Sequence, residues 1–372
     1  MSIYREAISV STVTLPRAAL AQMIRLVRTL FGLSQTPAYR QTVLPLVPDI
    51  ARFCPGHDSV MMGYDFHLGP DGVHLIEVNT NAGGALLAYL AQFPEGELAR
   101  GPLAGRLRRQ FLDSFAEEMQ RYSRGAKERP EHIAIIDEEP KAQYLYEEML
   151  AFTRLFEEWG VPSSIADPQE LVADADGVTL GGKRVDFVYN RHCDFYLERP
   201  EMAGLAAAYR AGTVCLSPNP FSYGLLADKR RLTLWSDPSA LESLGLDETA
   251  RALLAATIPE SRLLSTLDRQ RVWSERNDWV FKPVSRFGSR GVLLGRKISR
   301  SRFDQLDPRE TLVQRLVPPS MTPTSTGGEA MKTDFRLYVY RRRVLGVAAR
   351  LYQGQVTNLR TAGGGFAPVR VV

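Results

Sequence analysis

The sequence predicts a mixed α/β and α+β fold, in which an open, largely parallel α/β unit lies between two other parts of the chain. Three observations lead to this prediction. Two strand-like segments near residues 60–80 are joined by a turn signal, strands alternate with helices over residues 132–216, and the rest mixes strands with glycine-containing loops. A chain of 372 residues is too long for one small core, so we expect two or three domains.

The composition is that of an ordinary soluble globular protein, with 44% hydrophobic and 24% charged residues. The net charge of +4 is mild, and no Lys/Arg block has the extent or the aromatic residues of a nucleic-acid binder. Cys54, Cys193 and Cys215 lack metal-type spacing and are odd in number, which predicts reduced thiols in a cytoplasmic protein. No apolar leader and no run of about 18 apolar residues occurs, so we expect no membrane association.

The most informative segment is the strand-like stretch that contains Glu77 and Asn79. Side chains two apart on a strand share a face, so a carboxylate and an amide point the same way. Residues 71–72, Asp-Gly, are a two-residue hairpin signal, and the hairpin would bring Asp65 close to Glu77. Hard oxygen ligands in this arrangement suit magnesium. The alternative is an edge hairpin with solvated acids, but the apolar residues 75–76 indicate a buried strand.

Helical periodicity surrounds this hairpin. We expect helices over residues 16–33 and 38–53 that pack on it, and further helices over residues 85–123. The polar, basic stretch of residues 123–130 then predicts a domain boundary.

The middle of the chain alternates strands and helices. The expected elements are strands at 133–136, 161–166, 185–189 and 213–216, helices at 143–159 and 200–211, and a hairpin turn at 181–182. Asn190 and Arg191 directly follow the third of these strands, where ligands approach open parallel sheets. A capping or loop role for the two residues is equally open.

The last third of the chain predicts a phosphate site. Lys282 lies on the strand 280–283, which leads into the glycine-containing loop 285–291, and Lys229 lies upstream. Backbone N–H groups of such a loop and compact lysine charges suit phosphate oxygens. We expect a second mobile loop over residues 321–332. Together with the acidic platform, these features predict a nucleoside triphosphate site.

Two further strands, expected over residues 335–340 and 344–351, bring charged residues to the same region. Asp334 and Arg336 are two apart and share a strand face, and Arg350 ends the next strand. Such arginines could hold negative charge on a transferred phosphoryl group. A cross-strand salt bridge is an equally open interpretation for Asp334 and Arg336.

Taken together, these stretches resemble the ATP-grasp superfamily of carboxylate–amine ligases, and most closely its bacterial glutathione synthetase branch. The resemblance rests on residues 77–79, 217–220, 227–232, 280–283 with the following loop, 313–317, 334–336, Arg350 and 358–364. Each stretch alone is a loose match, but jointly they cover nearly the whole chain.

One departure concerns the order of the segments. In that family the Glu-x-Asn metal strand follows the segment that corresponds here to residues 358–364, whereas in this chain it lies at residues 77–79. The order resembles that of circularly permuted ATP-grasp proteins, and it predicts that residues 332–372 and residues 1 to about 95 form one domain. The expected domain segments are 1–125 and 320–372 for the ATP-grasp core, 130–228 for the α/β substrate domain and 229–319 for a lid subdomain.

The resemblance also implies roles for individual residues. For ATP it implies phosphate lysines, a glycine-loop lid and a hinge beside adenine, at Lys229, Lys282, Ser289, Gly291, Gln314, Arg315 and Leu316. It implies two magnesium ions held by Asp65, Glu77 and Asn79. It places Arg336, Arg350 and Asn358 at the reacting phosphoryl group. For the substrate it implies contacts from Asn190, Arg191, Gly363 and Gly364.

The implied activity is an ATP- and magnesium-dependent ligase that joins a small carboxylate, such as an amino acid or short peptide, to an amine through an acyl phosphate. Two alternatives stay open. A kinase of the same fold would make a stable phosphoester, and a non-catalytic nucleotide-binding protein would lack metal ligands or phosphate lysines. Relatives are often homo-oligomers, although no stretch here identifies an interface.

Overall fold

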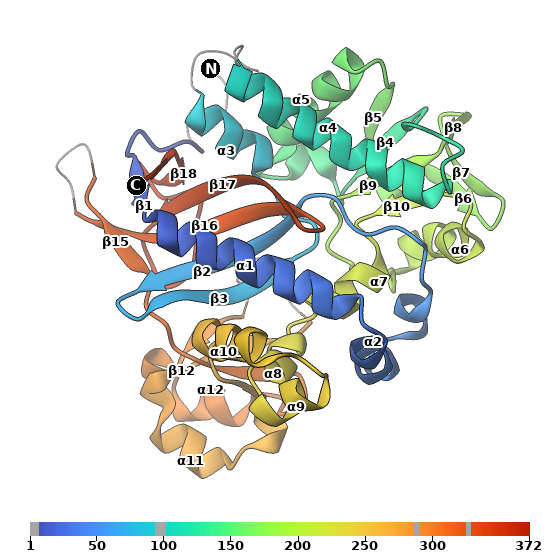
Figure 1. Cartoon of the computed structure of the whole chain (residues 1–372). Helices are drawn as coiled ribbons and strands as arrows, with labels where there is room; N and C mark the ends of the chain where they lie inside the picture. The colour runs from blue at the N-terminus through green and yellow to red at the C-terminus, as the bar shows by residue number, and fades with distance from the viewer. Residues whose placement is uncertain (1–6, 94–101, 286–290, 325–328) are drawn as a thin grey trace.

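The computed structural model describes residues 7–93, 102–285, 291–324 and 329–372, and it arranges them as three bodies. A central sheet crosses the molecule, an α/β unit lies beside it, and a smaller α+β unit hangs below the sheet (Figure 1). Within the described ranges, no helix combines the length and the apolar character that a membrane crossing requires.

The central sheet unites the two ends of the chain. Its order is β18-β17-β16-β2-β3, with the short strand β15 also paired to β16. The strands are β2 (Met62–Gly69), β3 (Gly72–Asn79), β15 (Ser320–Thr322), β16 (Met331–Tyr340), β17 (Arg343–Tyr352) and β18 (Gly365–Ala367). In addition, β1 (Val13–Leu15) pairs in parallel with β19 (Val369–Val371). Arg336 and Asp65, which are 271 residues apart in sequence, therefore pair in one sheet, as expected for the predicted order. Where the domains end stays a prediction.

Helices cover both faces of this sheet. The apolar stripe of α1 (Arg17–Ser34) packs with Tyr64, Phe66 and Leu75 on one face. On the other face lie α3 (Ala85–Gln92) and α4 (Pro102–Tyr122), which share a core with Tyr338 and Ala348. The sheet is therefore buried on both sides, which makes it a rigid support.

One helix prediction is wrong in extent. The expected helix 38–53 is only α2 (Pro37–Val43), followed by 3₁₀ turns at Leu44–Leu46 and Asp49–Arg52. Pro45 and Pro48 lack the N–H groups that a continuing helix needs. Of the expected helical stretch 85–123, the structure describes α3 (Ala85–Gln92) and α4 (Pro102–Tyr122), and residues 94–101 lie outside the described residues.

A β-bulge in β3 sets the direction of the hairpin's side chains. Asp65 pairs with Glu77 and Phe66 pairs with Leu75, so Ile76 is the extra residue between them. As a result Leu75 and Val78 both reach the core with α1, while Ile76 and Glu77 both face the opposite side. The predicted approach of Asp65 to Glu77 is confirmed, but the alternation pattern gives no sign of the bulge.

The α/β unit is an open parallel sheet, as predicted, and its strand order is β10-β9-β4-β5. Its strands are β4 (Ile133–Ile136), β5 (Ser163–Ala166), β9 (Phe187–Asn190) and β10 (Cys215–Ser217), with helices α5 (Tyr146–Glu158) and α6 (Ala203–Ala211). A meander of β6 (Leu171–Asp174), β7 (Gly177–Leu180) and β8 (Lys183–Val185) is attached. The predicted strand 185–189 is interrupted at Asp186, whose carboxylate accepts the backbone N–H groups of Glu131 and His132.

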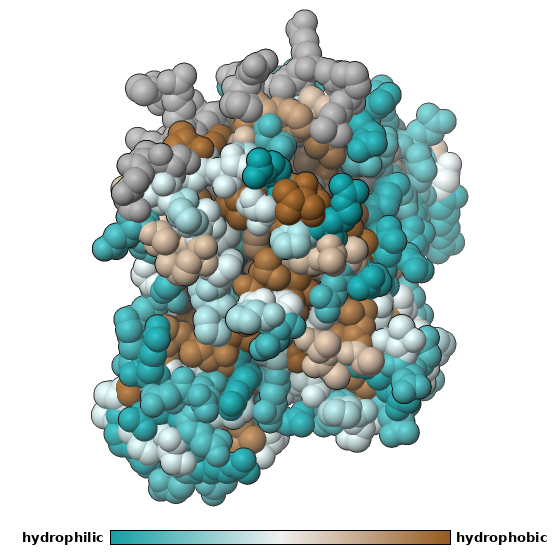
Figure 2. Space-filling model, turned by 60° about the vertical axis from the view of Figure 1, so that its left-hand side comes forward, coloured by the Kyte–Doolittle hydropathy of each residue, from teal (hydrophilic) through white to brown (hydrophobic). Residues whose placement is uncertain are grey.

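After α7 (Pro220–Ser222) and a π-helical turn at Tyr223–Ala227, the chain enters the smaller α+β unit. It has an antiparallel sheet of order β11-β14-β12-β13. Its elements are β11 (Ser261–Leu263), β12 (Trp279–Pro283), β13 (Leu293–Leu294), β14 (Thr311–Arg315), α8 (Arg231–Trp235), α9 (Pro238–Ser243), α10 (Glu248–Thr257), α11 (Arg269–Ser274) and α12 (Arg300–Asp304). Hydrophilic side chains dominate its projecting surface (lower left in Figure 2). The predicted loop 321–332 is shorter than expected, because β15 and β16 take up both of its ends.

One buried carboxylate ties the α/β unit to the central sheet. Glu118 on α4 accepts hydrogen bonds from the backbone N–H of Asp58, from the hydroxyls of Ser217 and Tyr340, and from the ring of His57. These donors come from three other segments of the chain, and the Glu118 side chain is fully buried. Each donor would be left unpaired without it, so this contact stabilises the junction.

We expect Glu118→Ala to lower the free energy of unfolding by about 3 kcal/mol or more, because an unpaired buried polar group costs about 1–3 kcal/mol. The neighbouring Glu117 pairs with the partly exposed Arg341 and Arg343, so Glu117→Ala should cost less than about 1 kcal/mol. Urea unfolding of both variants measures the difference, and equal losses would contradict the role given to Glu118.

Candidate active site

A cavity of about 750 Å³ lies where the three bodies meet. Side chains of β2, β3, β16 and β17 line it from the central sheet, β12 and β14 from the smaller unit, and loops after β4 and β9 from the α/β unit. The predicted site residues found in its lining are Asp65, Glu77, Asn79, Arg191, Lys282, Gln314, Arg315, Leu316, Arg336, Arg350 and Asn358. Residues from across the whole chain therefore converge on one space.

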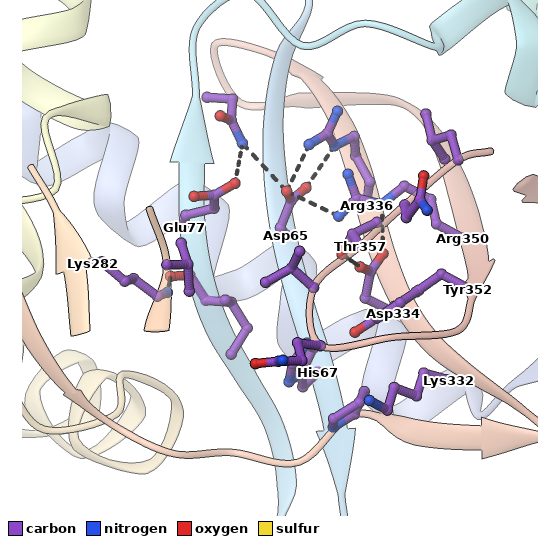
Figure 3. Close-up of a pocket in the computed structure, with 18 of the residues that line it drawn as sticks. Asp65, His67, Glu77, Lys282, Lys332, Asp334, Arg336, Arg350, Tyr352 and Thr357 are labelled. Atoms are coloured by element: carbon purple, nitrogen blue, oxygen red, sulfur yellow. Dashed lines mark hydrogen bonds and ion pairs between the residues drawn. The ribbon is translucent and has the colours of Figure 1, made fainter. Parts of the chain in front are cut away.

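A network of four charged side chains lies on the sheet side of the cavity. Arg336 donates through Nε and Nη2 to the two oxygens of Asp65, both at 2.6 Å. Arg350 donates through Nε to Asp334 at 2.5 Å and lies 3.0 Å from Asp65 through Nη2. Asp65 is directly opposite Arg336, and Asp334 is directly opposite Arg350, in the strand register. Figure 3 shows Lys282 and Glu77 on one side of Asp65, with both arginines on the other.

These contacts support the salt-bridge interpretation for Asp334 and Arg336, each of which pairs with a residue on a neighbouring strand: Asp334 with Arg350, and Arg336 with Asp65. Burial alone would raise the pKa of the Asp65 carboxyl, but the two guanidinium groups outweigh it and hold this pKa well below its usual range. Arg336 uses Nη1 as well, on the carbonyl of Gly83, so all three of its nitrogens are engaged. Nη1 of Arg350, by contrast, has no partner among the described residues.

Glu77 and Asn79 lie beside this network. The amide nitrogen of Asn79 is 3.3 Å from both Asp65 Oδ2 and Glu77 Oε1. The amide oxygen of Asn79 is therefore directed away from the two carboxylates, and Glu77 has no ion-pair partner in the described part of the chain. These two residues supply the oxygen atoms that are open to a cation.

Lys282 reaches the same space from the smaller unit. Its Nζ donates to Gln314 Oε1 at 2.6 Å and to the carbonyl of Ile76 at 3.1 Å. Ile76 is the bulged residue of β3, and a bulge leaves a residue unpaired in the ladder, which explains why this carbonyl accepts a lysine. Burial lowers the pKa of Lys282 to about 8, with Glu77 opposing the shift.

The other end of the cavity lies against the α/β unit. The Arg191 side chain is only 4% exposed and donates through Nη1 to Glu148 and to the Tyr189 hydroxyl, each at 3.2 Å. Glu148 also accepts the N–H groups of Gly84 and Leu86, which fixes the start of α3. Tyr144 donates to the carbonyl of Leu359 at 3.0 Å, which ties residues 355–360 to the α/β unit.

Six predicted site residues are not part of the described lining. Lys229 lies near enough for its charge to lower the pKa of Lys282, yet it is outside the cavity wall, as is Gly291. Ser289 lies outside the described residues. The Asn190 side chain accepts the N–H of His192 in a turn, so the loop role that we left open applies to it.

Gly363 and Gly364 are also absent from the lining. A Cβ on Gly364 would lie 2.4 Å from the carbonyl oxygen of Leu351, and Gly363 has a φ of +72°. Close backbone packing therefore accounts for Gly364, and a left-handed backbone conformation accounts for Gly363.

Several lining residues were missed from the sequence. They are His67, Asn81, Asp137, Lys332 and Thr357. His67 follows Asp65 by two positions on one strand, so the period of two could have found it. Its Nδ1 donates to the carbonyl of Val317, and burial lowers its pKa. Thr357 donates to Asp334, a loop contact that no local pattern indicates.

Comparison with known proteins identifies the fold. No family model and no curated protein matches the chain. A glutathione synthetase-like effector from Globodera pallida, in its apo form, is similar with a TM-score of 0.60 over 98% of this chain and 90% of its own, at 11% identity. A Methylobacillus flagellatus KT protein assigned as a gamma-glutamylcysteine synthetase has a TM-score of 0.51 over 94% and 87%, at 10% identity. The chain has a glutathione synthetase-like fold. At these identities the likeness concerns the fold alone.

The network predicts a specific loss of stability. Asp65→Asn leaves two buried guanidinium groups without their carboxylate, so we expect a loss of about 3 kcal/mol in the free energy of unfolding. Asp71→Asn, in the exposed hairpin turn, is the control and should change it by less than about 0.5 kcal/mol.

The pH dependence of the same variant tests the cause. The folded-state pKa of Asp65 is lowered, so its contribution is present above the unfolded-state pKa and is lost as the pH falls. The difference between wild type and Asp65→Asn should therefore shrink in acid. A difference that stays constant from pH 7 to pH 3 would contradict the ionic explanation.

Proposed function

We propose that the protein is an ATP- and magnesium-dependent carboxylate–amine ligase that works through an acyl phosphate. One observation carries this proposal: an open carboxylate and amide, a buried lysine and an arginine with an open nitrogen converge on one cavity from separate bodies. The glutathione synthetase-like fold supports it, because one named neighbour is called glutathione synthetase-like and the other is assigned as a gamma-glutamylcysteine synthetase.

The nucleotide would occupy the side of the cavity between β3 and β14. Ile76 and Leu316 line this region, and both offer apolar surface for a base. Lys282 would hold phosphate oxygens, and its contacts to Gln314 and to the Ile76 carbonyl already fix its direction. A lysine that is oriented before binding loses less conformational entropy when the phosphates arrive.

Magnesium fits the donor set on β3. The described structure leaves oxygens of Glu77 and Asn79 open to the cavity, and these are hard ligands of the kind that magnesium prefers. The negative charge of Asp65 is already neutralised by two arginines. We therefore expect the first ion to bind Glu77 and Asn79, and Asp65 to be a ligand of a second ion. When bound, magnesium would neutralise phosphate charge.

The remaining cavity residues would act on the carboxylate substrate and its phosphorylated form. A carboxylate is a poor electrophile, and its phosphorylation creates a good leaving group for attack by an amine. Arg350 would face the phosphoryl group through its open Nη1, while Arg336 would act by positioning Asp65. The acyl phosphate must be shielded from water, and the 355–360 segment that Tyr144 ties down covers this part of the cavity.

An assay with ATP, magnesium, a pool of amino acids and small carboxylates, and hydroxylamine as a trap tests the proposal. We expect ADP together with hydroxamate, because hydroxylamine intercepts an acyl phosphate. ADP with a stable phosphoester would instead establish a kinase. No ADP with any pool member, despite measurable ATP binding, would favour a protein that only binds nucleotide and would overturn the ligase.

Lys282→Met separates binding from folding. We expect at least a tenfold weaker affinity for Mg·ATP, because the substitution removes the positive charge that would attract the phosphates of ATP while it keeps the volume of the side chain. The pKa of Lys282 is lowered to about 8, so the folded protein holds this proton less tightly than the unfolded chain does. Below pH 8 the variant should therefore be as stable as wild type or more so.

Calorimetric titration with Mg·ATP and thermal unfolding measure the two effects. Lys297→Met, an exposed change in the same unit, is the control and should leave ATP affinity unchanged. Unaltered ATP affinity in Lys282→Met would remove this lysine from the phosphate site.

A further inference from the structure

Two basic side chains in the cavity lining have no role in the proposed reaction. Arg296 belongs to the 3₁₀ turn Gly295–Lys297 of the smaller unit, and Lys332 lies on β16 of the central sheet. Both line the cavity, so two cations from separate bodies converge on the same space.

This pair lies apart from the proposed metal and triphosphate site. Lys332 precedes Arg336 by four positions on β16, which places the two residues about 13 Å apart along the strand. Figure 3 shows Lys332 beyond His67, away from both Lys282 and Glu77. The pair is therefore a feature in its own right and not an extension of the phosphate lysine.

Lys332 is anchored, yet both cations keep donors open. In the strand register Lys332 lies between Met321 on β15 and Tyr352 on β17, which also line the cavity. Its Nζ donates to the carbonyl of Gly354, and a lysine has three donors, so two remain for a ligand. The guanidinium group of Arg296 has no partner among the described residues.

The positive charge here is not balanced by a nearby acid. Within the described ranges, no salt bridge joins a carboxylate to Arg296 or Lys332, and Asp334, two positions along β16, is already paired with Arg350. Burial and the repulsion of Arg296 and Lys297 lower the pKa of Lys332, so these cations lie close enough to act on one another. Uncompensated charge of one sign in a cleft attracts an anion.

The cavity wall connects this pair to the place proposed for the base. Leu316, beside which we place the base, is followed by residues 317–319, and all of them line the cavity as far as Met321. Met321 is directly opposite Lys332 in the strand register. A group on the ribose of a nucleotide held at Leu316 would therefore face this stretch of wall.

We propose that Arg296 and Lys332 form a phosphate subsite that is separate from the one at Lys282. The guanidinium group of arginine binds two phosphate oxygens at once, and lysine adds a compact charge. Two sources offer this chemistry: a 2′- or 3′-phosphate on the ribose of the bound nucleotide, and a free phosphate ion. The first source rests on the proposed nucleotide site, whereas the second does not.

Calorimetric titrations of the full chain test the subsite without turnover. AMP, adenosine 2′,5′-bisphosphate and adenosine 3′,5′-bisphosphate differ only in the ribose phosphate. We expect wild type to bind one of the two bisphosphates at least tenfold more tightly than AMP, because the extra phosphate gains charge-assisted contacts. Arg296→Gln and Lys332→Gln should each reduce this preference to less than about threefold. The ratio of the two affinities within one variant cancels any general change at the nucleotide site.

Lys297→Gln is the matched control, because Lys297 is an exposed cation next to Arg296 that lies outside the described lining. It should retain the full preference. A second titration uses inorganic phosphate alone, at constant ionic strength. Phosphate binding by wild type that Arg296→Gln and Lys332→Gln both weaken, without a preference for either bisphosphate, would support the subsite and identify the free ion as its ligand.

Equal binding of AMP and both bisphosphates, together with no binding of inorganic phosphate, would overturn the subsite. A preference or a phosphate affinity that survives in both Arg296→Gln and Lys332→Gln would overturn it as well. The same holds if Lys297→Gln lowers them as much as these two variants do, because only the general positive charge of the region would then be at work.

The outcomes also separate this proposal from the ligase. ADP and hydroxamate formed from ATP, with neither a bisphosphate preference nor phosphate binding, would support the ligase and reject the subsite. Inorganic phosphate bound through Arg296 and Lys332, without binding of any nucleotide, would support the subsite and reject the proposed nucleotide site.

Discussion

The buried carboxylate of Asp65 on β2 pairs with the guanidinium groups of Arg336 on β16 and Arg350 on β17. The cavity wall depends on this contact between three adjacent strands. Removing these charges from water is costly, and only close pairing recovers the cost. The pairing also fixes positions, since Arg336 is locked through every nitrogen while Arg350 keeps Nη1 open. A rigid sheet with helices on both faces holds this geometry. Ion pairing with Asp65 and Asp334 thus explains how two arginines can lie close together beside the cavity.

The rest of the site is assembled by contacts between bodies rather than within them. The bulge at Ile76 exposes a carbonyl that receives Lys282 from the smaller unit, and Tyr144 of the α/β unit holds the 355–360 segment of the sheet. Each body therefore contributes its own side chains to the cavity: carboxylates and arginines from the sheet, a buried lysine from the smaller unit, and Asp137 and Arg191 from the α/β unit. Movement between these bodies would change the positions of all three groups of side chains at once. Such coupling suits the proposed reaction, which must exclude water.

The sequence predicted what depends on local periodicity. The open parallel sheet, the hairpin and the approach of Asp65 to Glu77 follow from a period of two and a turn signal, and the structure confirms them. It could not predict the bulge, because one extra residue leaves no compositional trace. It also placed Asn190 in the site by its position after a strand, whereas the side chain turns back to cap its own loop. Asp137 became recognisable only once the strand order put β4 beside β9.

A crystal structure of the protein with magnesium and a non-hydrolysable ATP analogue tests the central claim most directly, which is that this cavity binds a nucleotide between the sheet and the smaller unit. The account predicts the base between Ile76 and Leu316, phosphate oxygens at Lys282 and a metal ion on Glu77 and Asn79. A nucleotide bound elsewhere, or a metal ion that avoids Glu77, would contradict it.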